Sequence, residues 1–151
     1  MTVHPTSEIG SEVEIGFDTT IWRWTQISPG AKIGNNCMIG NCCYIGPNVI
    51  IGNNVRIQNG SFIPECVTIG DGTFIGPNSV FTNDKYPMSP KEQWLKTNVG
   101  KNVIIGANST ILPGVTIGDN SIVGAGSVVT HSIPNNQAWF GNPARFYEIC
   151  N

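Results

Sequence analysis

Residues 45–81 read IGPNVIIGNNVRIQNGSFIPECVTIGDGTFIGPNSVF. A large apolar residue returns there at every sixth position: Ile45, Ile51, Ile57, Ile63, Ile69, Ile75 and Phe81. Four positions after each of the first six stands a small or β-branched residue: Val49, Val55, Ser61, Val67, Thr73 and Ser79. A helix repeats every 3.6 residues and a single strand every two, so neither has this period. The stretch predicts a six-residue unit with one large and one small inward side chain.

The same period covers most of the chain. It begins at Ile9, runs to Phe81, resumes at Val99 and continues in phase to Val129. Gly, Asn and Asp lie between the large residues and favour turn conformations that branched residues resist. Short strands joined by tight turns form a coil, and stacked coils bury a continuous Ile/Val ladder. We expect an all-β solenoid with three faces per coil and, at the spacing of neighbouring strands, roughly six coils.

The pattern [Ile/Val]-Gly-x-x-[small]-x resembles that of the hexapeptide-repeat acyltransferases. The resemblance implies a left-handed parallel β-helix, although general crossover rules favour the right hand. It also implies a homotrimer that binds acetyl-coenzyme A (acetyl-CoA) as a co-substrate between neighbouring prisms, with no permanently bound cofactor. We expect one domain over residues 1–151, with an extruded loop at 83–98 and a C-terminal cap at 131–151.

The amino-acid composition excludes several classes of binding partner. The net charge is −2 and only 12% of residues are charged, which argues against a nucleic-acid partner or an anionic membrane surface. No apolar run approaches the length of a membrane span, and the stretch MTVHPTSEIG lacks the basic and apolar regions of a signal peptide. The five cysteines show no C-x-x-C spacing, so we expect reduced, mostly buried thiols and no metal site. These features predict a soluble, cytoplasmic protein.

The repeat is interrupted by residues 83–98. A solenoid tolerates surface insertions, so the loop has a purely structural interpretation. Against it, four of the eight cationic residues fall within or just after the loop: Lys85, Lys91, Lys96 and Lys101. Phosphate groups on coenzyme A or a nucleotide need such charges. Trp94 has no place inside the prism, so we expect it to pack on a partner subunit. We favour a functional loop.

The stretches IWRW, IQN, FIGPNSVFTNDKYP, GANSTILPGVTIG and GNPAR look like those of nucleotide-linked 3-amino-sugar N-acetyltransferases. The resemblance implies transfer of an acetyl group to the amine of a dTDP- or UDP-linked 3-amino sugar, for surface polysaccharide or glycan synthesis. It places Asn83 beside the acceptor amine, with Asp84 as the second catalytic candidate. The substrate-binding candidates are Gln58, Asn59, Glu65, Lys85 and Tyr86.

Two positions depart from the family's pattern. Pro64 stands where an aromatic residue often precedes the Glu, and Met88 follows Pro87 where Arg is common. The missing Arg removes one contact to the acceptor's phosphates.

The two histidines, His4 and His131, are interpreted as exposed and non-catalytic. A hydroxyl is a poor nucleophile without a base, whereas an amine with a pKa near 8 is partly unprotonated at neutral pH. We therefore predict direct attack by the amine, oriented by Asn83, with Asp84 accepting the proton directly or through water. A backbone N–H at Gly106 or Ala107 would stabilise the oxyanion.

The second block of repeats is rich in small residues along its turns. Gly106, Ala107, Gly124 and Ala125 are predicted to border the pantetheine arm of coenzyme A, because small residues let a ligand approach the backbone. They are equally compatible with a role as turn residues only.

Two cations are predicted to contact the coenzyme's phosphates, Lys101 and Arg145. The aromatic tail at residues 136–150 is expected to cap the open end of the coil. Trp22 and Trp24 are outward aromatic residues that serve either a subunit interface, which we favour, or the stacking of a base.

Three other functions share elements of this pattern. Carbonic anhydrases of this fold need three histidine ligands for zinc, and the chain has two histidines. A non-enzymatic scaffold or ice-binding helix would carry regular outward Thr arrays, which this sequence lacks. An N-acyltransferase with another small amine acceptor or another acyl donor remains open.

Overall fold

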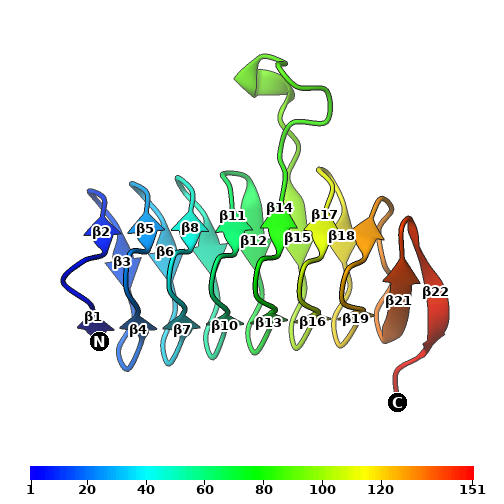
Figure 1. Ribbon diagram of the computed structural model, residues 1–151, viewed down its shortest axis with the longest axis horizontal. Coiled ribbons are helices and arrows are strands. Elements are labelled where there is room, and N and C mark those ends of the chain that lie inside the picture. The colour runs from blue at the N-terminus through cyan, green and yellow to red at the C-terminus, as the bar shows by residue number, and fades with distance from the viewer.

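The computed structural model describes residues 1–151. The chain winds into a left-handed parallel β-helix whose coils follow one another in a row from the N-terminus to the C-terminus (Figure 1). Each coil adds one short strand to each of three flat walls. The predicted fold class is confirmed.

The first wall holds nine strands: β1 (Thr2–Val3), β4 (Thr20–Ile21), β7 (Met38–Ile39), β10 (Arg56–Ile57), β13 (Phe74–Ile75), β16 (Ile104–Ile105), β19 (Ile122–Val123), β21 (Gln137–Gly141) and β22 (Ala144–Ile149). The second wall holds seven: β2 (Glu8–Ile9), β5 (Gln26–Ile27), β8 (Tyr44–Ile45), β11 (Phe62–Ile63), β14 (Val80–Phe81), β17 (Thr110–Ile111) and β20 (Val128–Val129). The third wall holds six: β3 (Glu14–Ile15), β6 (Lys32–Ile33), β9 (Ile50–Ile51), β12 (Val67–Ile69), β15 (Thr97–Val99) and β18 (Thr116–Ile117).

The helix has more coils than the six expected. The strands β1, β4, β7, β10, β13, β16, β19 and β21 each begin a coil on the first wall, which makes eight, the last of them incomplete. The extra length arises at both ends, where Val3 and Trp139 occupy anchor positions of the first wall through the pairs Val3↔Ile21 and Val123↔Trp139. We number the coils one to eight by these strands.

The turns between walls line up in three edges. The first edge joins the first and second walls, the second edge joins the second and third, and the third edge joins the third and first. Most turns have a residue with positive φ, which is most often Asn, for example Asn48 (φ 55°), Asn78 (φ 57°) and Asn108 (φ 57°). Asn tolerates this left-handed conformation better than branched residues do.

The glycine that follows many anchors has a different purpose. A Cβ added at Gly76 would lie 2.5 Å from the nitrogen of Ala107, and one at Gly106 would lie 2.4 Å from the nitrogen of Ala125. Successive turns approach too closely there for a side chain. The sequence interpretation assigned turn conformation to Gly and Asn alike, and the structure divides the two requirements between them.

The core is a cluster of 27 buried residues drawn mainly from the large and small repeat positions. Buried Ser and Thr at the small positions donate to a backbone carbonyl of the next coil, as Thr25 does to Gly40 at 2.6 Å. Cys37 and Cys43 occupy the same position and are buried, as expected, and their thiols donate to Gly52 and Gln58. Ile9 is 39% exposed because no coil of the structure covers it.

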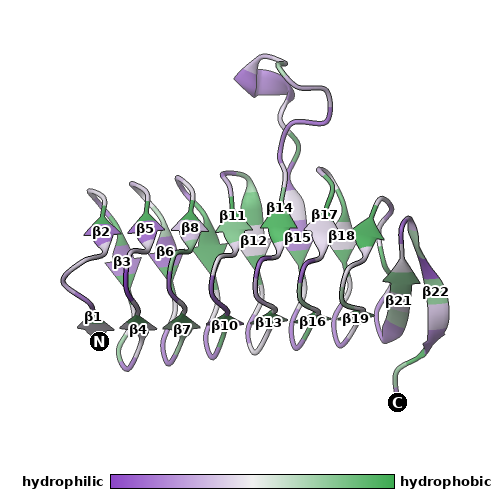
Figure 2. Ribbon diagram, in the orientation of Figure 1, coloured by the Kyte–Doolittle hydropathy of each residue, from purple (hydrophilic) through white to green (hydrophobic).

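The loop leaves the second edge in the fifth coil and projects outward beyond the turns of the neighbouring coils (Figure 1). It covers residues 82–96 rather than 83–98, because Thr97 already occupies the small inward position and pairs with Val67. Most of its length is hydrophilic (Figure 2). Its 3₁₀ turn η1 (Lys91–Gln93) is the only helical element, so nothing in the structure has the length or apolar character of a membrane-spanning helix.

The C-terminal tail is more regular than a simple cap. Strand β21 pairs in parallel with β19 and so extends the first wall by one more coil. The chain then turns back, and β22 pairs antiparallel with β21. Ala138 and Ala144 are buried beneath this hairpin.

Candidate functional site

The base of the loop is tied to the coil below it. The side-chain amide of Asn83 donates to the carbonyl oxygen of Glu65 at 3.1 Å, and the N–H of Leu95 donates to the carbonyl of Asn83 at 2.9 Å. Asn83 therefore connects the outgoing strand, the returning strand and the fourth coil. Its side-chain oxygen has no partner within the chain and is free to accept a hydrogen bond.

A cavity of about 290 Å³ lies beside Asn83. The rings of Tyr44 and Phe62 form one wall of it, stacked with their centroids 4.8 Å apart. Pro47, Pro64, Glu65, Asn83 and Trp94 complete the lining. The two rings supply aromatic surface where Pro64 replaces the aromatic residue common in the family's pattern. Sequence reasoning missed them, although an outward aromatic pair 18 residues apart, one coil, was a readable signal.

Trp94 lies over its own prism. It shares the cavity with Tyr44 and Phe62, and its indole N–H is buried without a hydrogen-bond partner. Trp94 therefore contacts its own prism through this cavity, and it is half-buried in the single chain. Packing of Trp94 on a partner subunit stays a prediction. The ammonium of Lys91 lies 5.9 Å from the centre of this indole.

Glu65 lines cavities on both sides of the loop base. Its side chain is only 16% exposed and pairs with the ammonium of Lys91 at 2.8 Å. The hydrogen bond that the ammonium of Lys91 donates to this carboxylate raises the pKa of Lys91. The loop thus supplies the ammonium of Lys91 as a counter-charge for a carboxylate that is largely removed from solvent.

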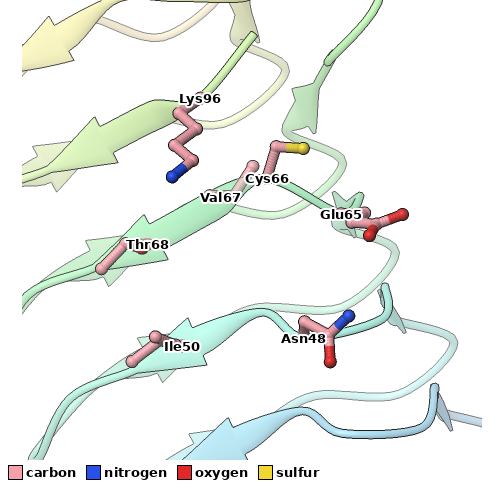
Figure 3. Close-up of a pocket in the computed structure, with 7 residues that line it drawn as sticks. All are labelled: Asn48, Ile50, Glu65, Cys66, Val67, Thr68 and Lys96. Carbon is pink, nitrogen blue, oxygen red and sulfur yellow. The ribbon is translucent and has the colours of Figure 1, made fainter. Parts of the chain in front are cut away.

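On the third-wall side a second cavity of about 260 Å³ opens beside Glu65 (Figure 3). Lys96, the last residue of the loop, hangs over Cys66 and strand β12 there, and it forms no ion pair (Figure 3). Burial, followed by the nearby carboxylate of Glu65, raises the pKa of the Cys66 thiol, so this thiol stays protonated at neutral pH.

Asp84 is engaged in organising the loop. Its carboxylate accepts hydrogen bonds from the hydroxyl of Ser89, from the N–H of Ser89 at 2.9 Å and from the N–H of Tyr86 at 3.1 Å. The Ser89 hydroxyl is the main cause of the lowered pKa of Asp84, and the two backbone bonds lower it further. A carboxylate held in this way is ionised, and these bonds use three of its roughly four acceptor sites.

The other loop candidates are exposed. Tyr86 is 75% exposed, and the ammonium of Lys85 lies 5.7 Å from the centre of its ring. Neither touches the cavity beside Asn83.

Gln58 and Asn59 lie in the same coil as Glu65 but on the first edge, one wall away from Asn83. The structure brings them together instead with the turns that contain Gly106, Ala107, Gly124 and Ala125, which occupy the same edge in the sixth and seventh coils. The acceptor candidates are therefore divided between two edges of one chain.

A ladder of side-chain oxygens caps the turn N–H groups of the third edge. The N–H of Asn35 donates to Asn53 at 2.8 Å, that of Asn53 to Asp71 at 2.8 Å, and that of Lys101 to Asp119 at 2.7 Å. Each cap comes from the turn of the next coil.

The first edge begins a similar ladder and then stops. The N–H of Arg23 donates to Asn41 at 3.0 Å and that of Asn41 to Asn59 at 2.8 Å. Beyond Asn59 the equivalent residues are Pro77, Ala107 and Ala125, none of which has a side-chain oxygen. The N–H groups of Asn59, Ala107 and Ala125 consequently have no acceptor in the chain. They form a short row of free donors.

The two residues predicted to contact the phosphates of coenzyme A, Lys101 and Arg145, lie in different parts of the structure. Arg145 pairs with Phe140 in the final hairpin, whose ring packs against Gly124 at the C-terminal end of the first edge. It lines a cavity of about 350 Å³ with His131 and Trp139. Lys101 lies on the third edge, 3.4 Å from Asp71, and shares no cavity with the free N–H row.

His131 is exposed, as expected. His4 is half-buried and accepts a hydrogen bond from the Nε of Arg23 at 3.2 Å. No group of three or more His, Cys, Asp or Glu side chains lies close enough to hold a metal ion.

Comparison with solved structures finds the same fold in several bacterial proteins. WeeI from Acinetobacter baumannii AYE is 27% identical with a TM-score of 0.63, and the match covers 95% of this chain and 56% of that one. PerB from Caulobacter crescentus, solved with CoA and GDP-perosamine, is 23% identical with a TM-score of 0.52, over 98% and 58%. A variant of AntD, an N-acyltransferase from Bacillus cereus solved with dTDP and coenzyme A, is 21% identical with a TM-score of 0.59, over 99% and 80%.

The chain spans a little over half the length of WeeI and PerB. No curated protein matches it by sequence. The bacterial transferase hexapeptide repeat matches residues 12–47, 30–65, 48–83 and 96–131, which together cover the prism on both sides of the loop. On this match, the chain belongs to the bacterial transferase hexapeptide-repeat family.

Proposed function

We propose that this protein transfers the acetyl group of acetyl-CoA to the amine of a nucleotide-linked 3-amino sugar, destined for surface polysaccharide or glycan synthesis. Membership of the transferase family supports the reaction class. The observation that carries the proposal is the row of free N–H groups at Ala107 and Ala125, on an edge where the N–H groups of Arg23 and Asn41 are capped. Such donors suit the amide-rich pantetheine arm of coenzyme A.

Coenzyme A would lie along the first edge from the sixth coil to the C-terminal hairpin. In this position the N–H of Ala107 or Ala125 faces the thioester or the pantetheine amides, and Arg145 faces the phosphates. PerB and AntD, which share the fold, were both solved with coenzyme A bound. Lys101, which is paired with Asp71 on another edge, takes no part in this arrangement.

Asn83 and Ala107 are too far apart to act on one substrate within a single chain. They lie on different edges of the second wall, and the strand between those edges, two residues in β14, alone rises about 7 Å. Reacting atoms must approach to about 3–3.5 Å. We therefore propose a homotrimer in which the first edge of one copy faces the loop of the next copy.

The outward side chains of the three walls support such packing. Phe62 and Val80 on the second wall and Ile104 on the first wall are large and exposed. The third wall presents mainly polar side chains, and Lys32 pairs with Glu14 there at 3.0 Å. In a trimer whose three helices are parallel, the same coil of each copy lies at the same level along the axis. Asn83 leaves the fifth coil and Ala107 lies in the sixth, so the two meet at nearly the same level.

The chemistry needs no histidine. The amine nitrogen attacks the thioester carbonyl carbon, the C–S bond breaks, and the leaving thiolate takes the proton that the nitrogen loses. The free side-chain oxygen of Asn83 accepts a hydrogen bond from the amine and orients its lone pair. The N–H of Ala107 stabilises the oxyanion. Asp84 acts in this scheme by holding the loop, because its oxygens are already bonded to Ser89 and Tyr86.

The test is release of free thiol from acetyl-CoA with a panel of acceptors: UDP- and dTDP-linked 3-amino sugars, the same sugars without nucleotide, and simple alkyl amines. We expect the nucleotide-linked 3-amino sugars to react with the highest kcat/KM. Preference for a simple amine would favour the alternative of an N-acyltransferase with another small acceptor. No thiol release with any member would overturn the proposal.

A further inference from the structure

A cavity between Trp22 and Gln58 on the first edge, which we call the slot, contacts neither the proposed coenzyme A site nor Asn83. The first turn residue on this edge is Gly in the third, fifth, sixth and seventh coils, but Trp22 occupies it in the second coil and Gln58 in the fourth. Gly40, which has no side chain, lies between them. Two coils separate Trp22 from Gln58, which is about 10 Å at the spacing of neighbouring strands. The resulting cavity measures about 280 Å³ and is also lined by Met38, Asn41 and Asn59.

The slot combines one aromatic face with unused amide groups. Trp22 is 44% exposed, so its ring is open to a ligand. The side-chain oxygens of Asn41 and Asn59 are occupied by the ladder, which leaves their NH₂ groups as donors. The side-chain amide of Gln58 has no partner in the chain and offers both a donor and an acceptor. A ligand with a flat ring that carries a hydrogen-bond donor next to an acceptor fits this combination of an aromatic face and free amide groups.

Two cations flank the slot. Arg56 is exposed on strand β10, two residues before Gln58, and forms no ion pair. Arg23 follows Trp22 directly, forms no ion pair, and donates from its Nε to the Nε2 of His4 at 3.2 Å. An aromatic face, a free amide and unpaired guanidinium groups together match a base, and the phosphates that follow it.

The height of the slot fits the proposed reaction. It spans the second to fourth coils, Asn83 leaves the fifth, and Ala107 lies in the sixth. A ligand that extends along the first edge from the slot toward the C-terminus therefore reaches the level of Asn83 after one further coil. Coenzyme A approaches the same level from the opposite end.

We propose that the slot between Trp22 and Gln58 binds the nucleobase of the acceptor, with Arg56 directed at its diphosphate. This inference rests on the proposed function, because it assigns the nucleotide half of that acceptor. It makes Trp22 a binding residue, whereas the sequence favoured a subunit interface for it.

Titration calorimetry with UDP, dTDP and GDP as probes tests the assignment. The wild-type protein is expected to bind at least one of them. Trp22→Ala and Gln58→Ala should each raise its Kd by about tenfold, the effect of losing one stacked base or its amide contact. Trp24→Asn is the matched control: it removes a neighbouring indole that lies outside the slot, and should leave Kd within about twofold. The Kd of coenzyme A should not change in any of the three variants.

Failure of the slot is separable from failure of the reaction. Binding of none of the three probes, or equal binding by wild type and Gln58→Ala, would overturn the slot even if acetyl transfer is observed. Weaker binding in Trp22→Ala and Gln58→Ala with no acetyl transfer would support the slot and refute the reaction. The mass in solution is measured for each variant. Should Trp22→Ala dissociate while Gln58→Ala binds normally, Trp22 is an interface residue and the proposal is wrong.

Discussion

The side-chain NH₂ of Asn83 lies 3.1 Å from the carbonyl oxygen of Glu65, so the first turn of the loop is anchored to the coil beneath it. The bond uses the donor half of the amide and leaves the acceptor half unpaired, in a residue that lines the cavity with Tyr44 and Phe62. One side chain thus fixes the loop and keeps an oxygen available to accept a hydrogen bond.

Replacing this residue tests its second role. Asn83→Ala is expected to lower kcat/KM for acetyl transfer about 100-fold, because the amine loses the group that orients it. Thiol release with separate determination of kcat and KM is the measurement. Gln93→Ala, an exposed change in the same loop, serves as the control and should leave both constants unchanged. An Asn83→Ala protein within threefold of wild type would remove Asn83 from the mechanism.

The free donors on the first edge can be deleted one at a time. Ala107→Pro and Ala125→Pro each remove an N–H, and Pro77 already occupies the equivalent turn position after Gly76 without disturbing the coil. We expect Ala107→Pro to raise the Kd of coenzyme A or to lower kcat by about 100-fold, the usual loss for one oxyanion donor. Calorimetry and thiol release distinguish the two effects.

Ser11→Pro is the control for these variants, since it places proline at the same turn position in the first coil, far from the site. If Ala107→Pro and Ala125→Pro both match Ser11→Pro in Kd and kcat, coenzyme A does not use this edge.

The pH dependence of kcat/KM distinguishes two roles for Asp84, one that stabilises the loop and one that accepts the amine proton. Hydrogen bonds from Ser89 and Tyr86 place its pKa below the ordinary 3.8. The ionised carboxylate therefore stabilises the loop at pH values above 3.8, and this contribution is lost as the pH falls through the lowered pKa. At neutral pH, Asp84→Asn should raise the acceptor KM about five- to tenfold by loosening the loop. The shape of the pH profile of kcat/KM should not change.

A general base behaves differently. If Asp84 accepts the amine proton, Asp84→Asn will lower kcat by a factor of about 10²–10⁴ and alter the acidic limb of the profile. That result would restore the catalytic role expected from the sequence.

Trp24 is strained where it stands. It occupies the turn position that has positive φ (54°), which in most coils belongs to Asn or Gly, and its side chain is 63% exposed. A bulky residue in this conformation costs about 1 kcal/mol or more relative to Gly or Asn. Trp24→Asn should therefore raise the free energy of unfolding by about 0.5–1 kcal/mol, and Tm by a few degrees.

Thermal and urea unfolding at fixed protein concentration measure this change. Asn78→Ala is the opposite control, because it places a strained side chain at the same turn position (φ 57°), and should lower Tm. A lower Tm for Trp24→Asn, together with a smaller mass in solution, would show that the indole packs on a second copy.

Much of this architecture was predictable, because the repeat is a local property. Anchors such as Ile45 and Ile51 recur every six residues, and the turn between them needs a residue that accepts positive φ, such as Asn48. These requirements act over a few residues and repeat, so the sequence alone determined a coil of short strands with an Ile/Val core and a break at the loop. The number of coils exceeds the expected six because Val3 extends the series by one step before Ile9, and Trp139 continues the first wall out of phase with the series.

The tertiary structure decided which residues share a surface. Asn59 and Glu65 are six residues apart but lie on different edges, whereas Asn59 and Ala107 are far apart in sequence and lie on the same one. The loop lacks the six-residue repeat, so the sequence does not predict its path. Tertiary contacts such as that of Lys91 with Glu65 determine the path and bring Trp94 against its own prism. The free N–H groups at Ala107 and Ala125 likewise depend on what stands one coil away, which only the stacking of coils determines.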